Sequence, residues 1–155
     1  MEAPHVASLI RCSFQEQVRI LGLRESDYPN YVGFETESTV LRRMSAGIHV
    51  ALACRDDEWV GTISWMLRTD DATSGDIQRL AVLPSHRRNE YGHQLMRYAE
   101  AQLLATGALT AKLSIVAQFK RLLVYYEQQG YSVSGVRRVP SLPFELTLME
   151  KKLVG

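Results

Sequence analysis

The sequence predicts an α/β (α+β) fold in which a mixed central sheet of about six strands is flanked by about four helices. Two observations predict it. Apolar residues recur at helical spacing in four segments, and six other runs are typical of strands. A strand, a helix and a second strand also follow one another within residues 77–116, and this order gives parallel strands with a right-handed crossover. The composition, 46% hydrophobic and 23% charged, excludes long disorder.

Four segments carry apolar residues at helical spacing and predict helices. They are residues 1–20, 38–46, 91–105 and 118–129. Pro4 stands in the first turn of the first helix, where its missing amide proton costs nothing. A glycine, the residue that most easily takes the left-handed conformation found at helix ends, follows each of the other three. These glycines are Gly47, Gly107 and Gly130.

Six runs rich in β-branched, aromatic and aliphatic residues predict strands. They are residues 48–54, 59–67, 77–83, 113–116, 131–136 and 144–149. The acidic turn at residues 56–58 joins the first two runs into a hairpin, and the polar stretch 69–75 is expected to form a turn. In the last strand we expect alternate side chains to face inward. These are Phe144, Leu146 and Leu148.

Residues 1–155 are expected to form a single domain, because no linker, internal repeat or low-complexity segment divides them. No apolar run is long enough for a membrane helix, and the N-terminus lacks the features of a secretory signal. We therefore expect a cytoplasmic protein without membrane contact. Cys12 and Cys54 are expected to be buried thiols in a reducing compartment, since two cysteines form no disulfide framework.

Charge is distributed unevenly along the chain, although the net charge is only +1. Residues 1–76 hold 12 acidic and 7 basic side chains, whereas residues 77–155 hold 5 acidic and 11 basic ones. Nucleic acid is one explanation for a basic half, but the basic residues are scattered and no aromatic-interleaved patch accompanies them. A compact anionic ligand fits at least as well, and uneven charge without function is the third reading.

The loop 84–91, which precedes the crossover helix, is the first candidate for a binding site. Ligands of open sheets bind at the carboxyl ends of parallel strands, facing the start of the crossover helix. Exposed amide groups and the helix dipole favour an anion there. Arg87 and Arg88 add charge suited to phosphate oxygens, and Gly92 allows close approach to the backbone. A solvated loop that only caps the helix is the alternative.

Three motifs in order along residues 77–152, about half of the chain, resemble the GNAT superfamily of N-acetyltransferases. Leu80-Ala81-Val82-Leu83-Pro84-x-x-Arg87, followed by Gly92 and Leu95, is similar to the acetyl-CoA loop of that family. Tyr125-Tyr126-Glu127-Gln128-Gln129-Gly130-Tyr131 resembles its tyrosine–glutamate–x–x–glycine–aromatic segment. Leu142-Pro143-Phe144, followed by Leu148-Met149-Glu150-Lys151, resembles the last strand of one branch.

The resemblance implies a GNAT-like sheet with a splayed parallel pair in its middle and acetyl-CoA as the cosubstrate. It places the acceptor side in residues 1–47, coenzyme binding in 48–116, and a C-terminal helix and hairpin in 117–155. The pantetheine arm is expected on the free strand edge formed by Leu80, Ala81 and Val82. The pyrophosphate is expected on the following loop, formed by Arg87, Arg88, Asn89, Glu90, Tyr91, Gly92 and His93.

Tyr126 matches the tyrosine that, in the family, protonates the departing thiolate as a general acid. A packing aromatic with a satisfied hydroxyl is the alternative reading. The sequence departs from the family pattern at three positions. Glu90 replaces the first loop glycine, Phe119 stands where an asparagine is frequent, and Gln78 stands where relatives often carry an acidic residue. Gln78 cannot act as a base, so Asp76 and Glu35 are the fallback candidates.

The acceptor pocket is expected to involve the aromatic-rich loop 21–37 and the loop 137–144. Its candidate residues are Tyr28, Tyr31, Phe34 and Glu35. An aromatic pocket in the acidic half suits a cationic amine, and a small amine, an amino-acid derivative, a drug-like amine and a peptide N-terminus all stay open. His86 and His93 lack a third ligand, so no metal is expected.

The function implied by the resemblance is transfer of an acetyl group from acetyl-CoA to a primary amine of a small molecule or peptide by direct attack. A CoA-binding pseudoenzyme or regulatory module with weakened turnover is the second reading, supported by Glu90, Phe119 and Gln78. An unrelated α/β binding domain is the third. No nucleic-acid partner is expected. The resemblance allows a homodimer, but no segment of the sequence defines an interface.

Overall fold

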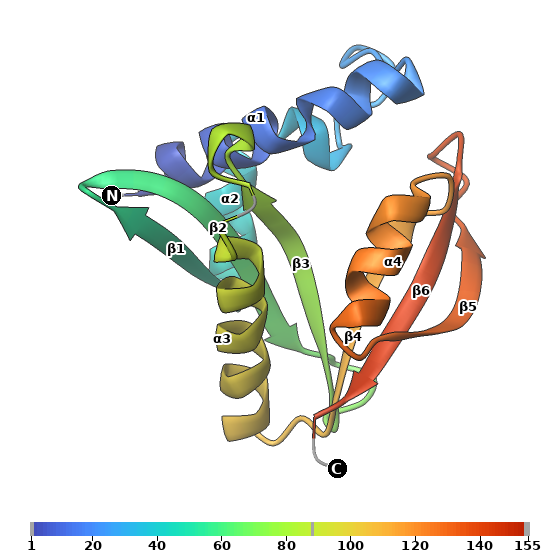
Figure 1. Cartoon of the computed structure of the whole chain (residues 1–155). Coiled ribbons are helices and arrows are strands. Elements are labelled where there is room, and N and C mark those ends of the chain that lie inside the picture. Colours follow the sequence, from blue (N-terminus) through green and yellow to red (C-terminus); the bar gives the residue numbers. More distant parts are fainter. Residues whose placement is uncertain (1, 88, 154–155) are drawn as a thin grey trace. The chain divides into compact units, whose positions relative to one another are not determined.

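The computed structural model describes residues 2–87 and 89–153. The helices of this described part are α1 (Ala3–Leu21), α2 (Glu37–Ser45), α3 (Tyr91–Ala105) and α4 (Lys120–Gln128), with short 3₁₀ turns η1 (Val32–Phe34) and η2 (Pro84–His86) (Figure 1). The strands are β1 (His49–Arg55), β2 (Glu58–Leu67), β3 (Ser74–Val82), β4 (Thr110–Val116), β5 (Ser132–Arg138) and β6 (Glu145–Lys152). All four expected helices and all six expected strands are therefore present.

The strands form one mixed sheet in the order β1-β2-β3-β4-β6-β5. Its parallel pair is β3 with β4, in which Ser74–Asp76 lie opposite Thr110–Lys112. The pairs β1–β2, β4–β6 and β5–β6 are antiparallel. The expected mixed sheet with a parallel pair in its middle is confirmed, and the parallel direction follows from the helical crossover between β3 and β4.

The chain divides into two compact units, each of which is described by itself. The first contains the residues up to Trp65 together with Arg79–Ala99, and the second contains Met66–Gln78 and the residues from Glu100 onward. No helix of the described residues is long and apolar enough to cross a membrane.

In the first unit, helices cover both faces of β2. The apolar stripe of α1 packs with α2 and β3 in a buried cluster. Its members are Ala3, Val6, Ala7, Ile10, Val40 and Ala81. On β2, Ser64 contacts α2 through Arg43, whereas its neighbour Trp65 contacts Tyr98 of α3 at 5.7 Å between ring centroids. Because successive side chains of a strand point to opposite faces, α2 and α3 lie on opposite faces of β2.

In the second unit, the end of α3 packs closely on β3. An added Cβ at Gly75 would lie 2.9 Å from Leu103 Cδ1 and overlap Cδ2, so a larger residue would force Leu103 to shift. A buried polar contact joins α3 to the C-terminal hairpin. The Tyr131 hydroxyl donates to Glu100 Oε2 at 2.7 Å, and Lys151 Nζ donates to Glu100 Oε1 at 3.0 Å.

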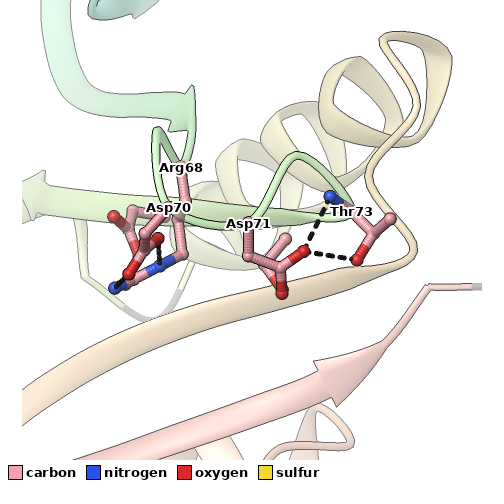
Figure 2. Close-up of polar contacts among 6 residues, drawn as sticks. Arg68, Asp70, Asp71 and Thr73 are labelled. Carbon is pink, nitrogen blue, oxygen red and sulfur yellow. Dashed lines mark hydrogen bonds and ion pairs between the residues drawn. The ribbon is translucent and has the colours of Figure 1, made fainter.

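The polar turn before β3 is shorter than the expected turn over 69–75, because β3 begins at Ser74. Figure 2 shows the Asp71 carboxylate accepting from the amide and the hydroxyl of Thr73, at 3.0 and 2.7 Å. Together with the Ser74 hydroxyl, these hydrogen bonds lower the pKa of Asp71 to about 2. In the same turn the Arg68 guanidinium makes two hydrogen bonds to Asp70, and the turn is thereby closed by side chains.

One expectation about burial is wrong and a second holds only in part. Cys12 and Cys54 are exposed free thiols, because Cys12 lies outside the apolar stripe of α1 and Cys54 lies near the end of the outer strand β1. Phe144, just before β6, is buried as expected, whereas Leu146 and Leu148 are only half-buried and the buried side chain within β6 is Met149, at 1% exposure. Met149 belongs to the opposite face of the strand, so a simple inward–outward alternation does not hold.

Candidate active site

The loop between β3 and α3 leads through a 3₁₀ turn into the start of a helix. Leu83 leaves the sheet after its amide donates to Val60 O at 2.9 Å, and η2 then turns the chain. Helix α3 begins at Tyr91, as predicted, and Gln94 N donates to Glu90 O at 3.0 Å as the first helical bond. Since the first amides of a helix find no acceptor within it, the positive end of α3 is directed toward the loop.

Glu90 adopts a conformation that glycine adopts at much lower cost. Its φ is +63°, in the left-handed region, and its side chain is exposed. A side chain in this conformation costs about 1–2 kcal/mol, which explains why a glycine suits the position. The backbone of the loop is therefore compatible with the glycine pattern, although the residue itself departs from it.

Arg87 does not extend freely into solvent. Its Nη2 donates to the carbonyl and the hydroxyl of Ser13, at 2.9 and 3.1 Å, and so fastens the loop to α1. Arg88 lies outside the described residues. Asn89 is exposed, and the first residues of α3, including Gly92, are half-buried. His93 is half-buried in the first turn of α3.

The β1–β2 hairpin contributes a charge that the sequence analysis did not include. Arg55 Nη1 donates to the Tyr91 hydroxyl at 3.1 Å, and this bond raises the pKa of Arg55. His86 lies beside it, with Nδ1 3.1 Å from the Ser85 hydroxyl and its ring 6.3 Å from that of Tyr91. Only the hairpin topology brings Arg55 here, since 36 residues separate it from Tyr91. No group of three metal-ligating side chains exists among the described residues.

The expected pantetheine strand is well packed. Ala81 is 1% exposed within the α1–α2 cluster, Val82 is also buried, and Leu80 is half-buried. Arg79 immediately precedes them and has a left-handed φ of +53°. Such a residue within a strand is typical of a β-bulge, which changes the direction of the residues that follow.

The aromatic residues expected in the acceptor pocket pack mainly against α1. Tyr31 and Phe34 are buried edge to face, with ring centroids 6.1 Å apart. The Tyr31 hydroxyl donates to Gln17 Oε1 at 3.2 Å, and burial raises the pKa of Tyr31 to about 12. Gly33 permits this packing because a Cβ there would overlap Val18. Tyr28 is half-buried.

Glu35 is buried and paired. Its residue is 3% exposed, and its carboxylate accepts from Arg79 Nε at 2.6 Å and lies 3.8 Å from Arg43 Nη1. Arg43 also donates to the Ser64 hydroxyl at 3.0 Å. Burial, together with the charge of Arg79, lowers the pKa of Arg43 to about 10. Asp76 is likewise paired, with Arg68 at 3.0 Å. Both carboxylates are therefore already occupied by guanidinium groups.

Tyr126 belongs to the second unit, on the last turn of α4. Its side chain is buried, and its ring contacts Tyr125 and Tyr131 edge to face, at 5.1 and 5.9 Å between centroids. Burial, and then the charge of Tyr125, raise the pKa of Tyr126, so that the phenol carries its proton at neutral pH. Phe119 precedes α4 as its N-terminal cap residue and makes no side-chain cap. Gln78 is half-buried in β3.

A family model and a similar protein of known activity both identify acetyltransferases. Residues 9–131 match the family model for the Acetyltransferase (GNAT) family. An aminoalkylphosphonate N-acetyltransferase of Salmonella typhimurium is 31% identical over 102 residues. That alignment covers 64% of this chain and 66% of the relative, so the chain spans slightly less than two thirds of the relative's length.

Solved structures with low sequence identity share the fold. Aminoglycoside 6'-acetyltransferase type Ii has a TM-score of 0.73 at 21% identity, with 99% of this chain and 90% of that chain covered. The PaiA N-acetyltransferase of Thermoplasma acidophilum, in complex with coenzyme A, has a TM-score of 0.76 at 19% identity, with 97% and 92% covered. The family match extends over most of the residues, and the chain therefore belongs to the GNAT acetyltransferase family.

Proposed function

We propose that the protein is an acetyl-CoA-dependent N-acetyltransferase that acts on a primary amine of a small molecule or a peptide. The observation that carries the proposal is the turn that leads from β3 into the start of α3 at Tyr91, in a chain of this family. It offers helix-start amides, the half-buried Gly92 and the nearby charge of Arg55 to an anion.

The residues of the first unit would bind the coenzyme in two parts. The backbone of Leu80, Ala81 and Val82 would hydrogen-bond to the pantetheine arm. The loop from Arg87 to His93 would hold the pyrophosphate. Because Arg87 is bonded to Ser13, its main part in this proposal is to hold the loop in shape, while the helix start supplies the donors.

Tyr126 would act as the general acid. The amine nitrogen forms a bond to the thioester carbonyl carbon, the carbon–sulfur bond breaks, and the phenol gives its proton to the departing thiolate. The buried phenol carries its proton at neutral pH, as a general acid must before negative charge develops on sulfur. The attacking amine must also lose a proton. Glu35 and Asp76 are paired with arginines, so we assign that proton to ordered water rather than to either carboxylate.

The acceptor class is taken from the relatives. Proteins similar to this chain include aminoalkylphosphonate, aminoglycoside and ribosomal-protein-alanine N-acetyltransferases. All three classes of acceptor carry a primary amine. We also assign the protein to a reducing cytoplasm, since Cys12 and Cys54 are exposed and unpaired.

Glu90 supports the second candidate, a CoA-binding protein with little or no turnover, because it adds a carboxylate where the coenzyme carries phosphate. Thiol release from acetyl-CoA separates the two candidates. The test uses an aminoalkylphosphonate, an aminoglycoside and a peptide with an N-terminal alanine, and mass spectrometry identifies the product. Amine-dependent thiol release with an N-acetylated product supports the transferase. Coenzyme binding without release for any amine supports the second candidate.

A further inference from the structure

Arg79 has an unusual backbone conformation for its position. Among the described residues it is the one non-glycine residue with a positive φ inside a strand, since Asp56, Asp57 and Glu90 lie in a turn or at a helix start. A left-handed conformation is unfavourable for any residue with a Cβ and persists only where neighbouring contacts enforce it. Contacts of this kind come from another element of the first unit.

Glu35 supplies them. Arg79 Nε donates to Glu35 Oε2 at 2.6 Å, and the Glu35 side chain is only 2% exposed. A short, charge-assisted hydrogen bond away from water is among the stronger polar contacts in a protein. Arg43 lies 3.8 Å from the same carboxylate oxygen, and so a second guanidinium helps to hold the carboxylate in place.

The backbone of Glu35 is itself held firmly. Its amide donates to Val32 O at 3.2 Å at the end of η1, and its carbonyl accepts from Arg11 Nη1 at 3.2 Å. The next residue, Thr36, caps α2 by accepting from the amide of Thr39 at 3.1 Å. A carboxylate on such a rigid segment can impose a conformation on the strand that it contacts.

We propose that Glu35 is a positioning residue, which holds Arg79 in the left-handed conformation and thereby sets the strand edge Leu80–Val82 for acetyl-CoA. This inference rests on the proposed function, because it assumes that this edge binds the coenzyme. Glu35 therefore neither takes the proton of the attacking amine nor contacts the acceptor, since its carboxylate is buried and occupied by guanidinium groups. The loop that carries Glu35 thus determines the geometry of the coenzyme strand.

Glycine provides the decisive test, because it adopts a φ of +53° without support from a side chain. Arg79→Gly and Arg79→Ala both remove the guanidinium and leave Glu35 with the same partners, and they differ in whether the left-handed conformation is tolerated. We expect the Gly variant to bind acetyl-CoA about tenfold more tightly than the Ala variant. Equal dissociation constants would overturn the inference.

The second arm changes Glu35 itself. Glu35→Gln keeps an acceptor but removes the charge, and we expect it to weaken acetyl-CoA binding about tenfold by calorimetry. Adding Arg79→Gly to it is expected to restore most of that loss. Arg68→Gln is the matched control, since it removes the ion pair of Asp76 on the same strand and should leave the dissociation constant within about twofold.

The results differ if the Glu35–Arg79 ion pair only stabilises the fold and does not affect acetyl-CoA binding. In that case Glu35→Gln lowers the melting temperature but leaves the dissociation constant of acetyl-CoA unchanged for the folded protein. Adding Arg79→Gly to it then does not strengthen binding. That outcome overturns the inference and leaves the proposed function intact. If the unmodified protein fails to bind acetyl-CoA, the proposed function and this inference both fail. If Glu35→Gln does not fold, Glu35→Asp with and without Arg79→Gly makes the same comparison, and an unchanged dissociation constant in a folded Glu35→Asp protein overturns the inference.

Discussion

Replacing Glu90 is expected to strengthen coenzyme binding, and its charge and backbone effects can be separated. Glu90→Gln removes the charge and retains the strained left-handed φ of +63°, whereas Glu90→Gly removes both charge and strain. At an assumed separation of about 7 Å in water, a carboxylate and one phosphate charge repel each other by about 0.6 kcal/mol. Two phosphate charges give about 1.2 kcal/mol, which is roughly an eightfold change in affinity.

Dissolved salt screens the repulsion between the carboxylate and the phosphates and so reduces the expected gain in affinity. At physiological ionic strength the Debye length is about 8 Å, so roughly half of the interaction remains and the expected gain is about threefold. Calorimetric titration of acetyl-CoA at low and at physiological salt measures both values for Glu90→Gln. Identical dissociation constants for the variant and the unmodified protein at both salts would refute the electrostatic reasoning.

Glu90→Gly tests how the left-handed backbone conformation at residue 90 affects stability and binding. Relief of the left-handed conformation, about 1–2 kcal/mol, is largely offset by the greater freedom of glycine in the unfolded chain, about 0.5–1 kcal/mol. We therefore expect a free energy of unfolding within about 1 kcal/mol of the unmodified protein. If only Glu90→Gly improves binding and Glu90→Gln does not, clearance for the ligand rather than charge is the cause.

Three further predictions concern the second unit. Tyr126→Phe is expected to lower kcat by roughly 10²–10⁴-fold with little change in the dissociation constant of acetyl-CoA, as thiol-release kinetics and calorimetry would show; an unchanged kcat would remove the general-acid role. Gly75→Ala is expected to destabilise the fold by about 1–3 kcal/mol in urea unfolding, because the new methyl meets Leu103 Cδ1 at 2.9 Å; a neutral effect would mean that Leu103 moves aside. Asp71 has a folded pKa of about 2, below its unfolded value, so its contribution to stability is present above about pH 4 and is lost as the pH falls toward 2. Asp71→Asn should therefore be less stable than the unmodified protein at neutral pH, with the difference shrinking below pH 4, and a constant difference would contradict this.

Local sequence signals were sufficient to predict the helices and the loop before α3. Helix α3 begins and ends at the predicted residues, because Gly107 and the polar loop before Tyr91 are local boundaries. The start of β3 was missed, since Ser74 and Gly75 read as turn residues. Their strand conformation depends on the pairing with β4 and on the close approach of Leu103, which no local window contains.

The acceptor loop shows a second kind of limit. Aromatic residues in a loop predict a pocket and a packed core equally well, and here Tyr31 and Phe34 are buried against α1. The ion pair of Glu35 with Arg79 joins residues 44 positions apart, so no spacing rule reveals it. The buried thiols expected at Cys12 and Cys54 were wrong for a related reason, because composition does not say which face of an element is covered.

Binding of acetyl-CoA by the unmodified protein is measured first by its thermal stability at increasing coenzyme concentrations. A ligand that binds only the folded chain adds about 2.7 kcal/mol of apparent stability at 100 times its dissociation constant. We predict a clear, saturating rise in melting temperature, matched by a calorimetric dissociation constant. No rise up to millimolar acetyl-CoA would contradict the account, because the loop before α3 would then not hold the pyrophosphate.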